Sequence, residues 1–259
     1  MIIISRLPAS NQLPVQFTKT GLKNPSTTNI GVCVKPIHFH YNKTLELVEF
    51  IELNLLLGVT KFTLYNDTVG SQVNCLLEDY IKQGVLEVKP WRLNMESQKE
   101  IRTEGLFAAF NDCLYRNMNS FKYLMLIDFD EFIVPYQNNT LIDMILNINS
   151  QPLVQAGKKV NPLLTSSYSF QNSFFYLQWP NDPSVQMSPK LRTLLKTRRR
   201  QKFHPQKQRS KYICIPHFVK EVGNHFVWEF HHGRTLNVPT NIGFLHHYRI
   251  CEFGGKLNV

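Results

Sequence analysis

The feature that most constrains this fold is an uninterrupted apolar run that ends abruptly in acids. Residues Tyr123–Ile127 carry no charge, and Asp128, Asp130 and Glu131 follow them directly. Such a run predicts a strand buried on both faces, with the acids at its end. In a continuing extended backbone, Asp128 and Asp130 would project to the same side, about 7 Å apart. Two carboxylates this close indicate a cation between them, and the plainer alternative is an acidic turn after a core strand.

Periodicity along the rest of the chain predicts an α/β fold. Strands are expected at 30–37, 59–65 and 85–91, and helices at 42–57, 71–82 and 97–117, the last opened by the capping box Ser97-Gln98-Lys99-Glu100. A further helix follows Thr140. Strands that alternate with helices favour a central, mostly parallel sheet flanked by helices. Beyond residue 151 the alternation stops, and short aromatic-rich strands are expected at 166–170, 174–177, 212–215 and 227–230.

The balance of charge points to an anionic partner. The 259 residues carry a formal charge of +10, with a pI of about 9.4. This suits nucleic acid, an anionic membrane or a phosphorylated small molecule. Much of the excess lies between Lys196 and Lys202 and continues through Lys207, Arg209 and Lys211. A basic run of this kind is compatible with a solvated loop, a phosphate-binding segment or a nucleic-acid contact, and no recognised RNA or DNA motif accompanies it.

Cysteine spacing, glycosylation patterns and the lengths of the apolar runs indicate in which cellular compartment the protein could work. Five cysteines without a C-x-x-C pair argue against a zinc ribbon or a thioredoxin-type site. Glycosylation patterns at Asn42, Asn66 and Asn138 permit a secretory-pathway lumen. No apolar run reaches the roughly 18 residues of a membrane span. Residues 1–29, rich in Pro, Ser, Thr and Asn, are expected to form a linker or stem.

The acidic strand end determines which chemistry is expected. Carboxylate oxygens favour Mg²⁺ or Mn²⁺, and an ion held by Asp128 and Asp130 completes its shell with water and phosphate, so the predicted substrate carries a diphosphate. Asn66 and Asp67 end another predicted strand and join the candidate nucleotide-binding residues. Three functions are compatible with these residues: a glycosyltransferase of the GT-A type, a phosphatase of the haloacid-dehalogenase type, and a basic nucleic-acid-binding module. The phosphatase motif would need Thr or Val at the position of Phe132.

From about Val32 to Glu252 the chain resembles glycosyltransferase family 92. The resemblance rests on segments in a fixed order: Asn111-Asp112-Cys113, Tyr123–Pro135, Lys196-Thr197-Arg198, Lys202-Phe203-His204, Arg209–Ile213 and His246–Arg249. It implies a GT-A fold and the inverting, Mn²⁺-assisted transfer of a hexose from a UDP-sugar to a glycan or glycoprotein acceptor. Galactose is the sugar in characterised members. Residues 30–150 would form the nucleotide-sugar-binding half and 151–255 the acceptor-side half.

The resemblance also assigns roles to residues. Asp128 and Asp130 match the D-x-D that binds metal and donor, and His247 matches a late metal ligand, with His246 as second choice. The diphosphate or the acceptor is expected to meet the basic segment, namely Lys196, Arg198, Lys202 and His204.

Two expectations complete the prediction. An inverting transfer needs a base for the acceptor hydroxyl, and the carboxylate candidates are Glu229, Glu221 and Asp182. Relatives are Golgi proteins with an N-terminal membrane anchor, so the Golgi lumen is the expected location. This chain shows no such anchor, and contact with a membrane would depend on one.

Overall fold

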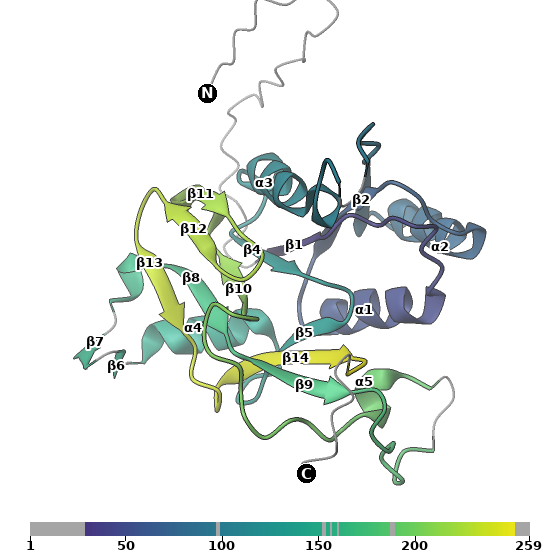
Figure 1. The fold of residues 1–259 in the computed structure, drawn as a ribbon. Helices are drawn as coiled ribbons and strands as arrows, with labels where there is room; N and C mark the ends of the chain where they lie inside the picture. Colours follow the sequence, from purple (N-terminus) through teal and green to yellow (C-terminus); the bar gives the residue numbers. More distant parts are fainter. Residues whose placement is uncertain are drawn as a thin grey trace, which may run out of the picture.

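The computed structural model describes residues 29–96, 99–151, 154–155, 157–159, 161–186 and 190–251. Its centre is a seven-stranded sheet in the order β13-β8-β10-β4-β1-β2-β3 (Figure 1). In chain order these strands are β1 (Ile30–Val34), β2 (Lys61–Asn66), β3 (Leu86–Pro90), β4 (Tyr123–Ile127), β8 (Thr165–Phe170), β10 (Lys211–Cys214) and β13 (Arg234–Asn237).

The first half of the sheet is parallel and the second half is mixed. Strands β3, β2, β1 and β4 pair in parallel, as expected from strands that alternate with helices. Strand β10 then runs antiparallel to both β4 and β8. The predicted fold class, α/β with a central and mostly parallel sheet, is therefore confirmed.

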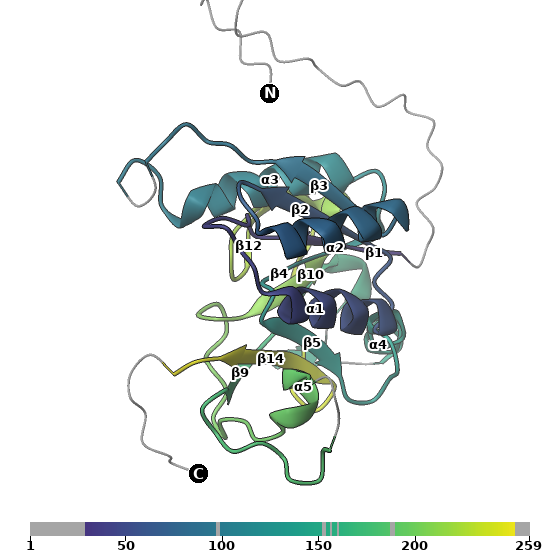
Figure 2. The same ribbon diagram turned by 90° about the vertical axis from the view of Figure 1, so that its right-hand side faces the viewer.

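Helices cover both faces of this sheet (Figures 1 and 2). Their bounds are α1 (Thr44–Leu56), α2 (Ser71–Lys82), α3 (Leu106–Asn117) and α4 (Leu141–Ser150), with a short α5 (Arg192–Leu195) near the second sheet. Successive side chains of β1 point to opposite faces of the sheet. Val32 and Val34 pack in one core with α1, α2 and α4, whereas Cys33 packs in the other with α3. Both faces of β1 and β4 are buried, which is why these strands read as continuous apolar runs.

A second, three-stranded sheet forms the lower part of the molecule in Figure 1. It contains β5 (Glu131–Pro135), β9 (Asn172–Tyr176) and β14 (Gly243–Arg249). The central β14 pairs antiparallel with β5 and parallel with β9, so the C-terminal histidines lie beside the strand that follows the acids. The hairpin β11 (Val219–Val222) and β12 (Val227–Phe230) packs near α3, and β6 (Val154–Gln155) and β7 (Lys158–Lys159) form a small ribbon.

Two local predictions are wrong. The helix expected from residue 97 begins at Leu106, because Thr103, Glu104 and Gly105 all have positive φ and interrupt the helix. Ser97 and Gln98 of the predicted capping box lie outside the described residues. The backbone also does not continue extended past Ile127. It turns, and the Glu131 N–H donates to the Asp128 carbonyl at 3.1 Å before β5 begins.

Other local signals are confirmed by the structure. Helix α2 has the predicted bounds, and the Thr140 hydroxyl accepts the N–H of Asp143 at 3.1 Å as the N-cap of α4. A disulfide between Cys33 and Cys113, which the spacing did not reveal, ties β1 to α3. Residues 1–28, the greater part of the predicted linker or stem, lie outside the described residues. Within the described chain, every helix is too short or too polar to cross a bilayer.

Candidate active site

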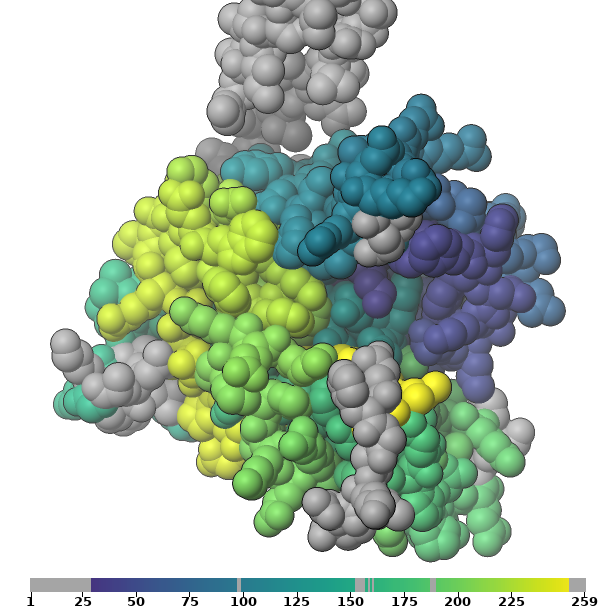
Figure 3. Space-filling view, in the orientation of Figure 1, coloured from purple at the N-terminus to yellow at the C-terminus, as the bar shows by residue number. Residues whose placement is uncertain are grey.

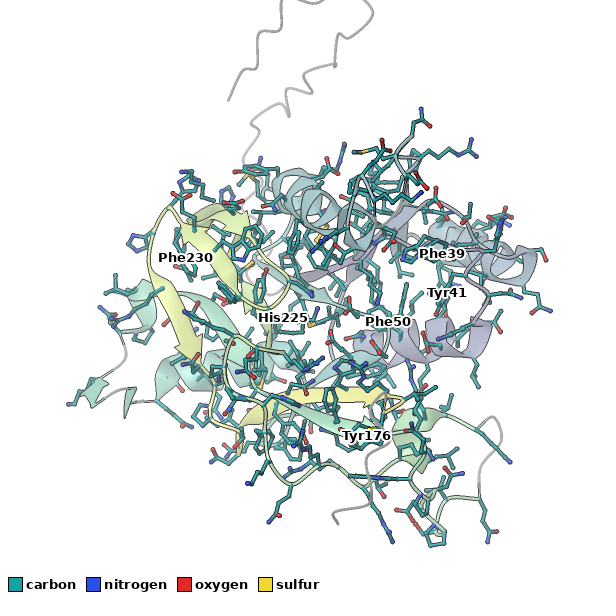
Figure 4. All side chains as sticks on the ribbon, in the orientation of Figure 1. Phe39, Tyr41, Phe50, Tyr176, His225 and Phe230 are labelled. Atoms are coloured by element: carbon teal, nitrogen blue, oxygen red, sulfur yellow. A yellow bond between two sulfur atoms is a disulfide. The ribbon has the colours of Figure 1, made fainter. Side chains whose placement is uncertain are left out.

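A cavity of about 580 Å³ opens at the carboxyl ends of β1 and β4. Its walls are the loop after β1, the turn between β4 and β5, the turn between β11 and β12, and the end of β14. Tyr41 of the first loop and His225 of the β11–β12 turn both belong to this lining (Figure 4). In the space-filling view, N-terminal and C-terminal segments meet around this central region (Figure 3). Open α/β sheets bind ligands at this edge, where adjacent strands send their connections in different directions.

An acidic cluster with a buried lysine forms one side of the cavity. The Glu131 carboxylate accepts the Asp128 backbone N–H at 3.0 Å. The fully buried Lys211 places its Nζ 3.5 Å from Asp128 Oδ2 and 3.3 Å from Glu131 Oε2, and it donates to Asn224 Oδ1 at 2.6 Å. Lys35 lies 3.9 Å from Asp128 on the cavity side. Burial raises the pKa of Asp128, but the two lysines outweigh it and hold that pKa below its usual range.

Asp130 and His247 form the neighbouring pair. The register of β14 against β5 sets His247 opposite Glu131, and His247 Nε2 lies 3.2 Å from Asp130 Oδ2. On its other side, His247 Nδ1 lies 3.0 Å from the side-chain nitrogen of Asn172 and 3.4 Å from Glu131 Oε1, so both ring nitrogens have polar partners. Burial raises the pKa of Asp130, yet the hydrogen bond from His247 reverses the effect and lowers it.

Aromatic packing and one arginine fix the turn that carries the two aspartates. The Phe129 ring stacks on Tyr41 at 5.4 Å and meets Phe50 edge-on at 5.1 Å. Arg192 of α5 donates to the Phe129 carbonyl and pairs with Glu46 at 2.7 Å. Because backbone and side chain are both held, Asp128 and Asp130 are positioned before any ligand binds.

The cavity is lined by cations that the sequence analysis did not place there. Lys35, Arg209 and Arg249 belong to its walls, and both guanidinium groups lie 5.4 Å from the Phe174 ring. A signal for Lys35 was present, because it follows the end of a buried strand as Asp128 does. The arginines stood in the motifs that carried the family resemblance, but without an assigned role.

The predicted basic segment lies elsewhere. Lys196, Arg198 and Lys202 are not part of the cavity lining, and Lys196 donates to the Trp179 carbonyl. His204 is not part of the lining either, but its ring lies 4.7 Å from that of Phe174, which in turn contacts His247 at 5.1 Å.

The other predicted donor-binding and metal-binding residues, Asn66, Asp67 and His246, do not line the cavity. Asn66 and Asp67 lie behind the loop after β1, where the Asp67 N–H donates to the Ile37 carbonyl. His246 points away from the cavity, 2.8 Å from the Tyr136 hydroxyl and stacked on Phe175, and burial lowers its pKa to about 3.

The three candidate bases do not line this cavity. Asp182 is partly exposed and accepts from the hydroxyls of Ser184 and Thr197. Glu221 and Glu229 lie on β11 and β12, where Glu229 pairs with Lys220 at 2.7 Å on the surface. The sequence alone could not exclude these three acids as the base, because an acid on an exposed hairpin and an acid in a cavity wall have similar neighbours in the sequence.

Fold and site together define the class: an α/β protein with an acidic, cation-lined cavity at the carboxyl edge of a mostly parallel sheet, which is where such proteins bind ligands. The sequence profile described as glycosyltransferase family 92 matches residues 28–257. The chain therefore belongs to glycosyltransferase family 92.

Among curated proteins, the chain is 28% identical over 151 residues to the beta-1,4-galactosyltransferase galt-1 of Caenorhabditis elegans. That alignment covers 55% of this chain and 35% of the relative. Two crystal structures of S. aureus TarS match 60% of the chain at 16% identity, covering 23% and 38% of the TarS chains. Their TM-scores of 0.33 and 0.35 are too low to establish a shared fold.

Proposed function

We propose that the protein transfers a hexose, with galactose as the leading candidate, from a UDP-sugar to a glycan acceptor with inversion, assisted by Mn²⁺ or Mg²⁺. The observation that carries the proposal is the meeting of Asp128, Asp130 and His247 with Lys35 and Arg209 in one cavity. Acids suited to a metal beside cations suited to phosphate are what a nucleoside diphosphate requires. The galactosyltransferase relative supports the choice of sugar.

The residues at the cavity fit a divalent ion in type. Asp128 Oδ1 is buried without a hydrogen-bond partner in the described chain, and Asp130 and His247 add a carboxylate and an imidazole. Oxygen and imidazole ligands suit Mn²⁺. No group of three His, Cys, Asp or Glu side chains among the described residues already has the geometry of a metal site, so the shell would include diphosphate and water. When bound, the ion would neutralise charge on the UDP leaving group.

The lysines have a separate part in the proposed reaction. Lys211 compensates the charges of Asp128 and Glu131 from within the core, while Lys35, whose side chain is 43% exposed, can reach a ligand. Arg209 offers a planar, bidentate contact for phosphate oxygens. These side chains would hold the diphosphate so that the sugar faces the acceptor side of the cavity.

The proposed base must lie within reach of the acceptor hydroxyl. Since Asp182, Glu221 and Glu229 are outside the cavity, acids that line it or the adjoining cavity are the better candidates. Glu46 lines the main cavity, and Glu104 lines an adjoining one of about 220 Å³, with its carboxylate 3.4 Å from His38.

The test is an assay of UDP release from UDP-galactose, with a glycoprotein stripped of terminal galactose as acceptor. Product formation should need Mn²⁺ or Mg²⁺, and Asp130→Asn should lower kcat by about 100-fold or more, as expected for loss of a group that stabilises transition-state charge. The control is Asp79→Asn on the exposed face of α2, which should keep wild-type activity. Full activity in excess chelator would refute the proposed role of the metal ion. The lysines would then have to neutralise the charge of the UDP leaving group.

The Golgi lumen also remains part of this proposal. The disulfide between Cys33 and Cys113 supports an oxidising compartment, since such bonds persist there and are rare in the cytosol. Localisation of the tagged full-length protein in cells would test it.

A further inference from the structure

A second hollow, of about 450 Å³, lies between helix α3 and the β11–β12 hairpin. Three aromatic side chains line it: Phe107 and Tyr115 from α3 and Trp228 from β12. They are 41%, 52% and 44% exposed. We call this hollow the α3–β12 groove. Figures 1 and 3 show α3 and the hairpin side by side on the upper part of the molecule. Large aromatic rings gathered on a surface mark a binding site more often than chance exposure does.

The aromatic rings form one surface. The Phe107 and Trp228 centroids are 4.9 Å apart with their planes tilted by 36°, so the two rings are in direct contact. A side chain at Gly223 would place a Cβ 2.0 Å from Trp228 Nε1, so glycine at this position lets the indole lie directly against the backbone. The position of Trp228 is therefore set by the hairpin itself.

The floor of the groove is rigid. The Asn111 amide donates to the carbonyls of Phe107 and Val222 and accepts the Val222 N–H at 3.0 Å, which fastens α3 to β11. The Tyr115 hydroxyl donates to the Lys220 carbonyl at 2.8 Å. A ligand would meet a surface that is already ordered, so little conformational entropy would be lost on binding.

The polar groups at the groove indicate the class of ligand. Lys220 and Glu221 line it, and Glu229, the partner of Lys220, follows Trp228 directly. One ammonium and two carboxylates suit neither a polyanion nor a polycation. They suit a neutral molecule with many hydroxyls, which can accept from Lys220 and donate to Glu221. A pyranose ring combines such hydroxyls with an apolar face that packs on aromatic rings.

The groove and the active-site cavity share the hairpin. Its strands carry Lys220, Glu221 and Trp228 to the groove, while the intervening turn carries Asn224 and His225 to the cavity. Asn224 in turn accepts from Lys211, which contacts Asp128. A glycan held by the outer face of the hairpin is thereby kept near the reaction centre, which raises its effective concentration there.

From these contacts we infer that the α3–β12 groove is a second carbohydrate-binding site, which holds a neutral sugar ring of the acceptor glycan outside the active-site cavity. The assignment of the sugar to the acceptor rests on the proposed function, whereas the binding of a sugar by the groove does not.

Binding is tested without activity by NMR of the three tryptophan indole N–H groups, with lactose as the probe and saturating UDP present to occupy the donor site. Lactose should shift the Trp228 signal, identified by its absence in Trp228→Phe, and leave those of Trp91 and Trp179 in place. Phe107→Ala should weaken the lactose affinity by about tenfold, as expected for loss of one aromatic face. A Trp228 signal that does not respond to lactose overturns the inference.

The acceptor role is tested by kinetics with the degalactosylated glycoprotein. Trp228→Ala should raise the KM for the acceptor about tenfold, with an unchanged KM for UDP-galactose, and Trp228→Phe should restore much of the loss. Leu56→Ala, which removes an exposed apolar side chain of α1, serves as control. An unchanged acceptor KM alongside a lactose-dependent NMR shift would refute the acceptor role alone. Absence of transfer by the wild-type protein would refute the proposed function and leave the groove's sugar binding intact.

Discussion

Replacement of Lys211 by Met tests whether the acidic cluster depends on one buried charge. The lysine is fully buried and lies within 3.5 Å of Asp128 and Glu131. Its loss leaves Glu131 without a lysine partner and Asp128 with only the partly exposed Lys35, and breaking a buried pair in this way costs about 3–5 kcal/mol. That is a large fraction of the 5–15 kcal/mol by which a native protein is usually stable.

Urea unfolding followed by circular dichroism measures this effect. With a slope of about 3 kcal/mol per molar urea, the midpoint for Lys211→Met should fall by about 1–1.7 M. The double variant Lys211→Met/Glu131→Gln removes one positive and one negative charge together, so it should recover at least half of the lost stability. Lys220→Met, which breaks an exposed pair with Glu229, is the control and should leave the midpoint unchanged.

The Lys211 variants should also differ in their affinity for UDP. Folded Lys211→Met should bind UDP more weakly, because Asp128 is no longer held in place, and Lys211→Arg should recover part of the affinity. A Lys211→Met protein as stable as the wild type would refute the reasoning, as would a double variant no more stable than the single one. Either result would mean that Asp128 and Glu131 obtain their compensation elsewhere.

Two further predictions concern the covalent link and the cavity wall. Cys33→Ala removes the disulfide to Cys113, which closes a loop with a sequence separation of 80, and should lower the free energy of unfolding by about 2–4 kcal/mol in urea, while Cys75→Ala, at an exposed free thiol, should leave it unchanged. Arg209→Met should weaken UDP binding at least tenfold in calorimetry, whereas Lys202→Met should not, and equal losses would show that the basic segment also contacts the donor.

Local sequence signals predicted elements well where burial and capping act over a few residues. The strand at Tyr123–Ile127 and the N-cap at Thr140 depend on neighbours in the chain, and both appear as expected. The helix expected from residue 97 failed because periodicity did not register the positive φ angles at Thr103–Gly105, which break the helix just before Leu106. The fold class followed from the order of the elements.

The candidate site could be predicted only in part. Asp128 and Asp130 were expected at the end of a buried strand, and the structure places them in the wall of a cavity of about 580 Å³. Lys196, Arg198 and Lys202 were the obvious cation source by charge density, yet they lie outside the cavity, and Arg209 at the far end of the basic run lines it. A dense run of basic residues is typical of a solvated segment, whereas the cations at the site are single residues that come from separate parts of the chain.

By itself, the sequence determined the buried strands, the acids at the end of one of them and the family, because these follow from local burial and from motifs in order. Only the tertiary structure decided which partners those acids meet. Lys211 reaches Asp128 across 83 positions because β10 runs beside β4, and His247 reaches Asp130 across 117 because β14 pairs with β5. Strand pairing of this range is set by packing of the whole domain, which no local pattern records.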